Sequence, residues 1–481
     1  MRSSFYIQFK RGVLLTLFRL LLGLVKIKIL ASLLGVYGIG KLSLILQFNL
    51  FAQTFLSMGL AVVIINLARP YTIMHDFSTS SEILGTGVFI ASLNSLLLIS
   101  IFAFGNYFGL LPVYQLFDSL YFWLILIAAI LLSFASVIWE SICFIVDRYD
   151  IYVKINVIIA FVDTAFITLF AFKMGYNGIF IGLFLSAILQ FFIYAFFLLR
   201  NVTAKNIFKN LRVKRFWIKP LYFQGLRMQS ISLLLSLAPF IARLYFSQSN
   251  GSFANGHLQV ATALSSYLLP IILNGVWGHL HPFVAAHGDT HLSRNELVAT
   301  LEKVIPFSAA ASIFVVATSQ FTLEILYTSE FLPAKSTLIL YFIAEPFYAI
   351  FSIFAVYLLA IKSYRTCFMS HVLYYFILCA FVFFGNNLFG SQSYVYGHIL
   401  GALIASVVMF FWGYKNSIFK FSNIKSIITK PIIVLIYTCT YLCLLKLLHV
   451  SNTTLFLLSL VTLYFLFSSN FFARFSILKT S

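Results

Sequence analysis

Long apolar stretches dominate this sequence and constrain its fold more than any other feature. Each is long enough, at about 20 residues, to cross the hydrocarbon core of a bilayer as a helix. None shows the strict alternation of apolar and polar residues that is typical of barrel strands. The sequence therefore predicts an all-α polytopic membrane protein with about 14 transmembrane helices. The predicted helices occupy residues 11–34, 40–66, 83–104, 119–145, 151–173, 177–199, 221–245, 252–278, 298–321, 335–361, 366–385, 393–414, 427–449 and 453–473.

Composition supports this class. Hydrophobic residues make up 61% of the chain and charged residues only 9%, whereas soluble proteins carry about 25% charged residues. The first apolar stretch is too long for a cleavable signal peptide and has no small-residue cleavage site, so we expect it to remain as the first span. The five cysteines lie in apolar stretches without framework spacing and are expected to be small core residues.

Lys and Arg residues predict the orientation. Most of the 32 fall in one alternating set of loops and in the two tails. By the positive-inside rule, both termini are expected in the cytoplasm. The net charge of +19 is thereby explained by topology, and nucleic acid is not an expected partner. The basic run at 200–220 is expected to lie on the membrane surface, with a protein-partner site as the alternative.

Two pairs of similar segments indicate an internal repeat. VYGIGKLSL (36–44) resembles SFANGHLQV (252–260) at an offset of 216, and DRYD (147–150) resembles KSYR (362–365) at an offset of 215. The repeat predicts two six-helix lobes of the same orientation, with two further helices appended. The expected boundaries are 1–199 for the N-lobe, 200–220 for a cytoplasmic linker, 221–414 for the C-lobe and 415–481 for the added helices. Parallel repeats place the substrate pathway where the lobes meet.

The first span carries cations at hydrocarbon depth. Gly12, Thr16, Arg19, Gly23 and Lys26 form one small, polar and cationic helix face. Each cation near the bilayer centre costs about 2.5–3.5 kcal/mol on insertion scales. Either this face is a close helix contact with its cations paired to acids, or it lines a cavity that receives an anion. We favour the cavity, because three small residues do not neutralise two charges.

Other spans add polar and acidic residues. Gln53, Gln224, Arg227 and Gln259 suit sugar hydroxyls, although such groups also serve as ordinary hydrogen bonds between helices. Asp163 and Glu345 fall near the middle of their spans. For Asp163, structural pairing and coupling to H⁺ or Na⁺ are both open. For Glu140, which is nearer the cytoplasmic end, pairing is favoured.

Cations near the outer ends of spans have a different expectation. Lys28 is expected to extend to the interface, and Arg243 is expected to be interfacial.

Several absences narrow the function. No GxxxxGK[ST] motif is present, so ATP hydrolysis by this chain is not expected. No large outward loop carries the acidic residues that a membrane polymerase or glycosyltransferase would use, and the chain is not expected to be an enzyme. The four histidines of HLHPFVAAHGDTH (279–291) are expected in a cytoplasmic connector, with no metal site and no cofactor.

Three segments carry a resemblance to a known family. ILASLLGVYGIGKLSLILQF (29–48), ILYTSEFLPAKSTLILYFIAEPF (325–347) and LLAIKSYR (358–365) resemble segments of the O-antigen flippase (Wzx-type) family of polysaccharide transporters. The turn GVYGIG departs from the family pattern, since it lacks the proline and the acid common there. The resemblance implies the multidrug/oligosaccharidyl-lipid/polysaccharide exporter superfamily, with the two lobes in a MATE-like V that opens alternately to each side. It also implies transport of undecaprenyl-pyrophosphate-linked oligosaccharide across the bacterial inner (plasma) membrane, with an ion gradient as the energy source. Arg19 and Lys26 match the family's cationic first-span positions in kind.

The residues and the resemblance give one hypothesis. Arg19, Lys26 and Arg227 hold the pyrophosphate of the lipid-linked oligosaccharide, while Gln53, Gln224 and Gln259 face its sugars. Asp163 or Glu345 couples the cycle to H⁺ or Na⁺. The polymerase and chain-length proteins of the same pathway are candidate partners.

Three alternatives accompany this hypothesis. The first is a lipid II flippase, because the fourteen predicted spans resemble the lipid II flippases of the superfamily. The second is a multidrug antiporter, which would need an acidic cavity. The third is a polysaccharide polymerase, which would need a large outward loop.

Overall fold

A computed structural model describes residues 2–107, 120–146, 148–209, 211–416 and 418. Every regular element within these residues is helical. Nine of the described helices are long and apolar enough to cross a membrane, which confirms the predicted class of an all-α, multi-pass membrane protein. The predicted helices at 427–449 and 453–473 lie outside the described residues.

The chain divides into two compact units, Met1–Phe240 and Ile241–Ser481, here called the N-terminal and C-terminal units. The division falls within the predicted seventh span and not in the predicted linker, and residues 200–220 belong to the N-terminal unit. The helices of the N-terminal unit are α1 (Arg2–Ser57), α2 (Leu60–Ile73), α3 (Phe77–Tyr107), α5 (Leu120–Ile145), α6 (Tyr149–Leu199), α7 (Val202–Lys209) and the start of α8 (Arg215–His287).

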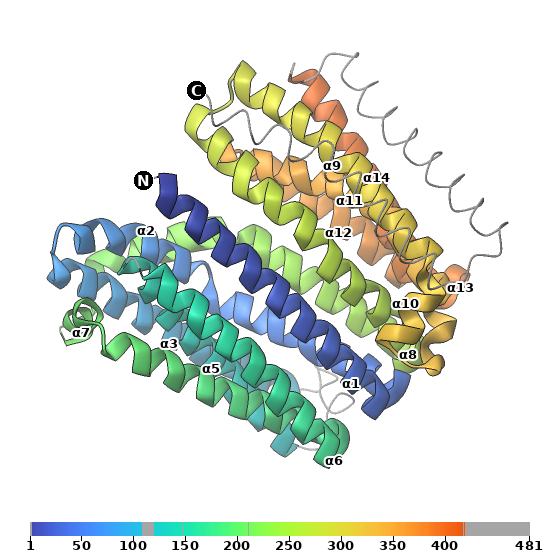
Figure 1. Ribbon diagram of the computed structural model, residues 1–481, viewed down its shortest axis with the longest axis horizontal. Coiled ribbons are helices and arrows are strands. Elements are labelled where there is room, and N and C mark those ends of the chain that lie inside the picture. The colour runs from blue at the N-terminus through green and yellow to red at the C-terminus, as the bar shows by residue number, and fades with distance from the viewer. Residues whose placement is uncertain (1, 108–119, 147, 210, 417, 419–481) are drawn as a thin grey trace. The chain divides into compact units, whose positions relative to one another are not determined.

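The C-terminal unit contains the rest of α8 and a second helical bundle. Its further elements are α9 (His291–Ala317), α10 (Ser319–Leu326), η1 (Ser329–Ala334), α11 (Lys335–Ala360), α12 (Tyr364–Phe384), α13 (Asn386–Phe389), η2 (Gly390–Gln392) and α14 (Ser393–Lys415). Within this unit, α11 packs against α9, α12 and α14. In the N-terminal unit, α6 packs against both α1 and α5 (Figure 1).

Three of the long helices are each two predicted spans joined at a glycine. The breaks fall at Gly35 in α1, Gly175 in α6 and Gly251 in α8, with φ of 62°, 60° and 81°. The chain of α6 reverses its direction at Gly175. This follows because a Cβ added to Gly182 would lie 2.8 Å from the Cα of Ile167. A straight helix would separate these residues by about 22 Å. Only glycine adopts these backbone conformations without strain, so the three positions fix the helical hairpins.

The positions of the glycine turns agree with the internal repeat. Gly35 and Gly251 are 216 positions apart, and Gly175 and Gly390, which also has a positive φ, are 215 apart. The same two offsets separate the similar sequence segments. The repeat therefore extends from the sequence to the backbone, since equivalent turns interrupt the helices at equivalent places.

The second predicted span, 40–66, is not continuous, and this expectation was wrong. Helix α1 ends at Ser57 and α2 begins at Leu60, with positive φ at Met58 (34°) and Gly59 (70°). A Cβ on Gly59 would lie 2.7 Å from the carbonyl oxygen of Gly225, and a Cβ on Gly225 would lie 2.5 Å from that of Met58. The break thus lets two backbones meet without side chains between them, a tertiary contact that hydrophobicity alone does not reveal.

Candidate functional site

Two cations of α1 contact two polar residues of α6. Lys26 Nζ lies 2.8 Å from Asp163 Oδ2, and Arg19 Nη2 donates a hydrogen bond to Asn156 Oδ1. The two cations are seven residues apart in α1, and their partners are seven residues apart in α6 in the same order. The first part of α1 and the first half of α6 therefore run in the same direction. We call Arg19, Lys26, Asn156 and Asp163 the cation ladder.

A second layer of hydrogen bonds orients the α6 side of the ladder. Ser186 Oγ donates to Asp163 Oδ1 at 3.2 Å. The Asn156 amide donates to the hydroxyl of buried Tyr194 at 2.9 Å and to the Tyr152 carbonyl at 2.9 Å. These bonds use the amide nitrogen of Asn156, so its oxygen is turned toward Arg19. The second half of α6 therefore helps to hold Asn156 and Asp163, in its first half, in position for the cations of α1.

The ladder can be reached from outside the N-terminal unit. Arg19 is exposed, and the Lys26 and Asp163 side chains are 27% and 32% exposed. Among the described residues, no carboxylate lies within ion-pair distance of Arg19. Glu140 acts on it only through its electrostatic field and is itself hydrogen-bonded to Tyr152. Arg19 thus keeps a positive charge that its direct partner, a neutral amide, does not cancel.

The structure separates the other predicted site residues between the units. Gln53 donates to Asn49 Oδ1 at 3.1 Å in α1. Gln224 and Arg227 are exposed in the first part of α8, three residues apart on one helix face. Within the described part of the chain, Arg227 has no carboxylate at ion-pair distance. These residues belong to the N-terminal unit, as does the ladder, whereas Gln259 and Glu345 belong to the C-terminal unit.

Arg243 is a buried residue of the C-terminal unit and was wrongly expected at the interface. Its side chain is among the largest that are fully buried, with 1% of the residue exposed. Its Nη1 donates to Gln259 Oε1 and its Nη2 to Thr262 Oγ1, both at 2.5 Å, while its Nε has no partner. The turn at Gly251 folds the second half of α8 back over Arg243. The one available signal was the 3-residue spacing of Gln259 and Thr262, which places both on one helix face.

Glu345 lies in a buried polar cluster of the same unit. It is 4% exposed, accepts a hydrogen bond from Ser265 Oγ at 2.5 Å and lies 3.9 Å from His398 Nε2. His398 is hydrogen-bonded to Tyr374 at 2.6 Å and stacks on Tyr341. This arrangement brings a carboxylate, an imidazole and hydroxyl groups together, away from water.

A small hollow adjoins Glu345. Two serine side chains of α9 line it, and the buried hydroxyl of one of them, Ser308, has no partner. A proton or a small cation suits these groups. No cluster of three or more metal-ligating side chains occurs in the part of the chain that the structure describes.

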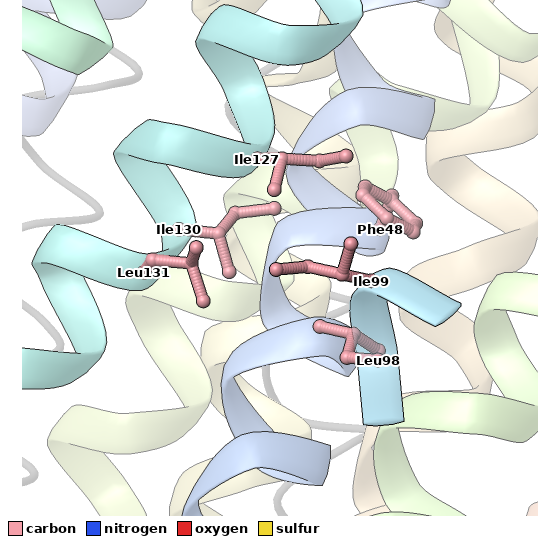
Figure 2. Close-up of a pocket in the computed structure, with 6 residues that line it drawn as sticks. All are labelled: Phe48, Leu98, Ile99, Ile127, Ile130 and Leu131. Carbon is pink, nitrogen blue, oxygen red and sulfur yellow. The ribbon is translucent and has the colours of Figure 1, made fainter. Parts of the chain in front are cut away.

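A second hollow, of about 230 Å³, lies in the N-terminal unit (Figure 2). It offers no group that would bind a phosphate or a sugar, because only apolar side chains line it. They are Phe48, Leu98, Ile99, Ile127, Ile130 and Leu131.

The helical hairpins and the repeat are consistent with a MATE-like fold. In agreement, the chain is similar to an inward-facing multidrug resistance MATE family transporter of the MOP superfamily, with a TM-score of 0.67, 16% identity, and 84% of this chain and 94% of that one covered. It is equally similar to the lipid II flippase MurJ in an inward closed conformation, with a TM-score of 0.67, 19% identity, and coverage of 96% and 99%.

A third similar structure is a MOP superfamily transporter from Pyrococcus furiosus, described as having a binding pocket of reverse polarity. Its TM-score is 0.53 at 13% identity, and 85% of this chain and 94% of that one are covered. No protein-family model matches the sequence, and no curated protein does. At these identities the structures establish the fold.

Proposed function

We propose that this protein is a flippase for undecaprenyl-pyrophosphate-linked oligosaccharide, such as an O-antigen repeat unit. It would move the head group from the cytoplasmic to the periplasmic leaflet of the bacterial inner membrane by alternating access. The observation that supports this most is the exposed guanidinium of Arg19 in α1, held by neutral Asn156. A cation kept at this depth with a neutral direct partner is suited to receive an anion.

The physical requirement is to carry a diphosphate through a layer that excludes charge. An isolated anion in hydrocarbon is prohibitively costly, and fixed cations in a hydrated cleft offset that cost. An arginine guanidinium presents a planar set of donors that matches two phosphate oxygens at once. Membrane potential, positive outside, adds about 2.3 kcal/mol per charge per 100 mV for outward movement of an anion. Arg19 and Arg227 are the residues we assign to this contact.

Lys26 and Asp163 have a different part in the proposal. In the described conformation the Lys26 ammonium is neutralised by Asp163 at 2.8 Å, so it does not add a free charge for the substrate. Proton uptake by Asp163 would remove the carboxylate charge beside Lys26, so that the ammonium would attract a phosphate more strongly. One pair would then link the ion gradient to the substrate. Glu345, with its Ser265 and His398 neighbours, is the second candidate for coupling.

Lipid II flippase activity is the second candidate function. The similarity to MurJ, over 96% of this chain, and the fourteen predicted spans favour it. A multidrug antiporter is less well supported, because two of the exposed site residues, Arg19 and Arg227, are cations. No described feature favours a polymerase.

The test replaces Arg19 and Lys26 together by alanine. We expect loss of surface polysaccharide with the variant still present in the membrane at the wild-type level. The matched control is Lys28→Ala, which removes a cation from the same helix outside the ladder. Wild-type surface polymer in the double variant would refute the assignment of the ladder to the substrate.

The substrate itself is identified by deleting the gene and analysing the lipid-linked saccharides. Accumulation of an oligosaccharide intermediate on the cytoplasmic face supports the first function. Accumulation of lipid II alone would replace it by the second.

A further inference from the structure

The basic run between α6 and α8 has a defined course on the N-terminal unit. Helix α7 buries Ala204 and Ile207 and packs against α3 (Figure 1). The Ala204 N–H donates to Asn201 Oδ1 at 3.1 Å, which caps the start of the helix. The segment is therefore folded against the bundle from its beginning.

Its second half is also fixed to α3. A Cβ on Gly85 would lie 2.6 Å from the carbonyl oxygen of Arg212, so the segment meets the α3 backbone directly. The Lys214 N–H donates to Thr86 Oγ1 at 3.0 Å, and Lys214 Nζ lies 2.7 Å from Glu82. Contacts with α3 thus decide which side chains of the segment face outward.

The outward face combines cations with large apolar side chains. Val202, Val213 and Phe216 are 73%, 53% and 73% exposed. Five cations beside them are exposed, and none has an ion-pair partner among the described residues. Glu82 pairs with Lys214, which is not one of these five. These five are Lys205, Lys209, Arg212, Arg215 and Lys219. We call these eight residues the basic surface.

We propose that the basic surface binds the headgroups of anionic phospholipids in the adjoining leaflet. The segment connects the membrane-spanning parts of α6 and α8, so it must emerge and re-enter at the bilayer surface. Cations near such a surface attract anionic lipids, and exposed valine and phenylalanine side chains gain free energy by entering the headgroup–acyl boundary. A nucleic acid would use the cations but not the aliphatic side chains. This inference goes beyond the flippase proposal and does not depend on it.

The experiment measures backbone hydrogen exchange of the full chain in nanodiscs. One set contains phosphatidylcholine alone, and the other contains phosphatidylcholine with phosphatidylglycerol. We expect exchange in 202–216 to slow at least about fivefold with phosphatidylglycerol, since each cation near an anionic surface contributes about that factor in binding. High salt should reduce the difference, because these charges are exposed.

Two variants test the assignment to these residues. Replacement of Lys205, Lys209, Arg212 and Arg215 by glutamine should abolish the difference between the two lipids. Val213→Ser with Phe216→Ser should reduce it while leaving every charge in place. The matched control replaces three exposed cations of the C-terminal unit, Lys303, Arg365 and Lys415, by glutamine and should keep the full effect.

The outcomes separate the possible partners. Equal exchange in both lipids, or an unchanged difference in the glutamine variant, would overturn the proposal. Protection that appears only on adding a cytoplasmic protein would overturn it in favour of a protein-partner surface. All the substituted side chains are exposed, and monodisperse elution in detergent verifies that each variant is folded.

Discussion

The two units hold a cation at nearly equivalent positions and treat it in opposite ways. Lys26 and Arg243 are 217 positions apart, within one of the repeat offset. In the N-terminal unit, Lys26 is partly exposed and paired with the carboxylate of Asp163. In the C-terminal unit, Arg243 is sealed from solvent and bound by the neutral groups of Gln259 and Thr262. The first arrangement can exchange partners, whereas the second would leave a buried charge unsatisfied if it opened.

The acids differ in the same way. Asp163 is 32% exposed, while Glu345 is 4% exposed and accepts a hydrogen bond from buried Ser265. The acid–cation pair of the N-terminal unit is partly exposed. The acid of the C-terminal unit is buried and lines the adjoining small hollow. Under the proposed function, substrate contact therefore belongs to the N-terminal unit, and internal stability or a coupling ion belongs to the C-terminal one.

The largest effect is expected for Gln259→Leu. This change leaves Nη1 of a fully buried guanidinium without its acceptor, which should lower the free energy of unfolding by about 2–3 kcal/mol. Unfolding in detergent by heat or denaturant measures the loss. The control Gln53→Leu, in the N-terminal unit, should lose less than about 1 kcal/mol, because Gln53 is hydrogen-bonded only to partly exposed Asn49. Equal losses would show that Arg243 is not sealed.

A smaller effect is expected from the Lys26–Asp163 pair. Lys26→Met and Asp163→Leu should each destabilise the protein, and the double variant should recover part of the loss. The coupling free energy should be about 1 kcal/mol, since both side chains are partly solvated. A double-mutant cycle of unfolding free energies measures it. Strictly additive losses would mean that the pair does not form in the membrane.

The smallest effect concerns the connector after α8. Asp289 accepts hydrogen bonds from Arg294 at 2.9 and 3.0 Å and from the Tyr357 hydroxyl at 2.7 Å. The hydrogen bond with Arg294 is the largest influence that lowers the pKa of Asp289. Because the pKa of Asp289 is lower in the folded protein, its ionised carboxylate stabilises the fold at pH values above the ordinary pKa. This stabilisation is lost as the pH falls through the pKa of the folded protein.

Asp289→Asn should therefore reduce stability near neutral pH by less than about 1 kcal/mol, because the carboxylate is partly exposed. The difference from the wild type should disappear in acid, which melting temperatures across pH would show. The corresponding variant of an ion-paired acid in the N-terminal unit is Glu82→Gln, which removes the ion pair between Glu82 and Lys214. A difference between Asp289→Asn and the wild type that grew in acid would contradict the sign of this pKa shift.

Local sequence predicted much of the fold. Apolar length gave the spans because each must fill the same hydrocarbon thickness. The repeat was visible because equivalent turns need equivalent glycines, as at Gly35 and Gly251. The interruption at Gly59 was missed, since its cause is the backbone of Gly225, far away in the sequence.

The candidate site was predictable only in part. Helical spacing placed Arg19 with Lys26, and Asn156 with Asp163, on shared faces. It left open whether the two faces meet. The prediction placed Arg243 at the interface, whereas it is buried. Its burial depends on the second half of α8 folding back over it, and the periodicity of the sequence does not predict that contact.

By itself, the sequence determined that this protein spans a membrane many times, in a repeated helical pattern, with cations at hydrocarbon depth. Those properties follow from the composition and spacing of single segments. Only the tertiary structure decided which cation is neutralised, by Asp163, and which is enclosed, by Gln259 and Thr262. The physical reason is that the partner of a charge is set by contacts between distant helices, whereas the cost of burying that charge belongs to the segment alone.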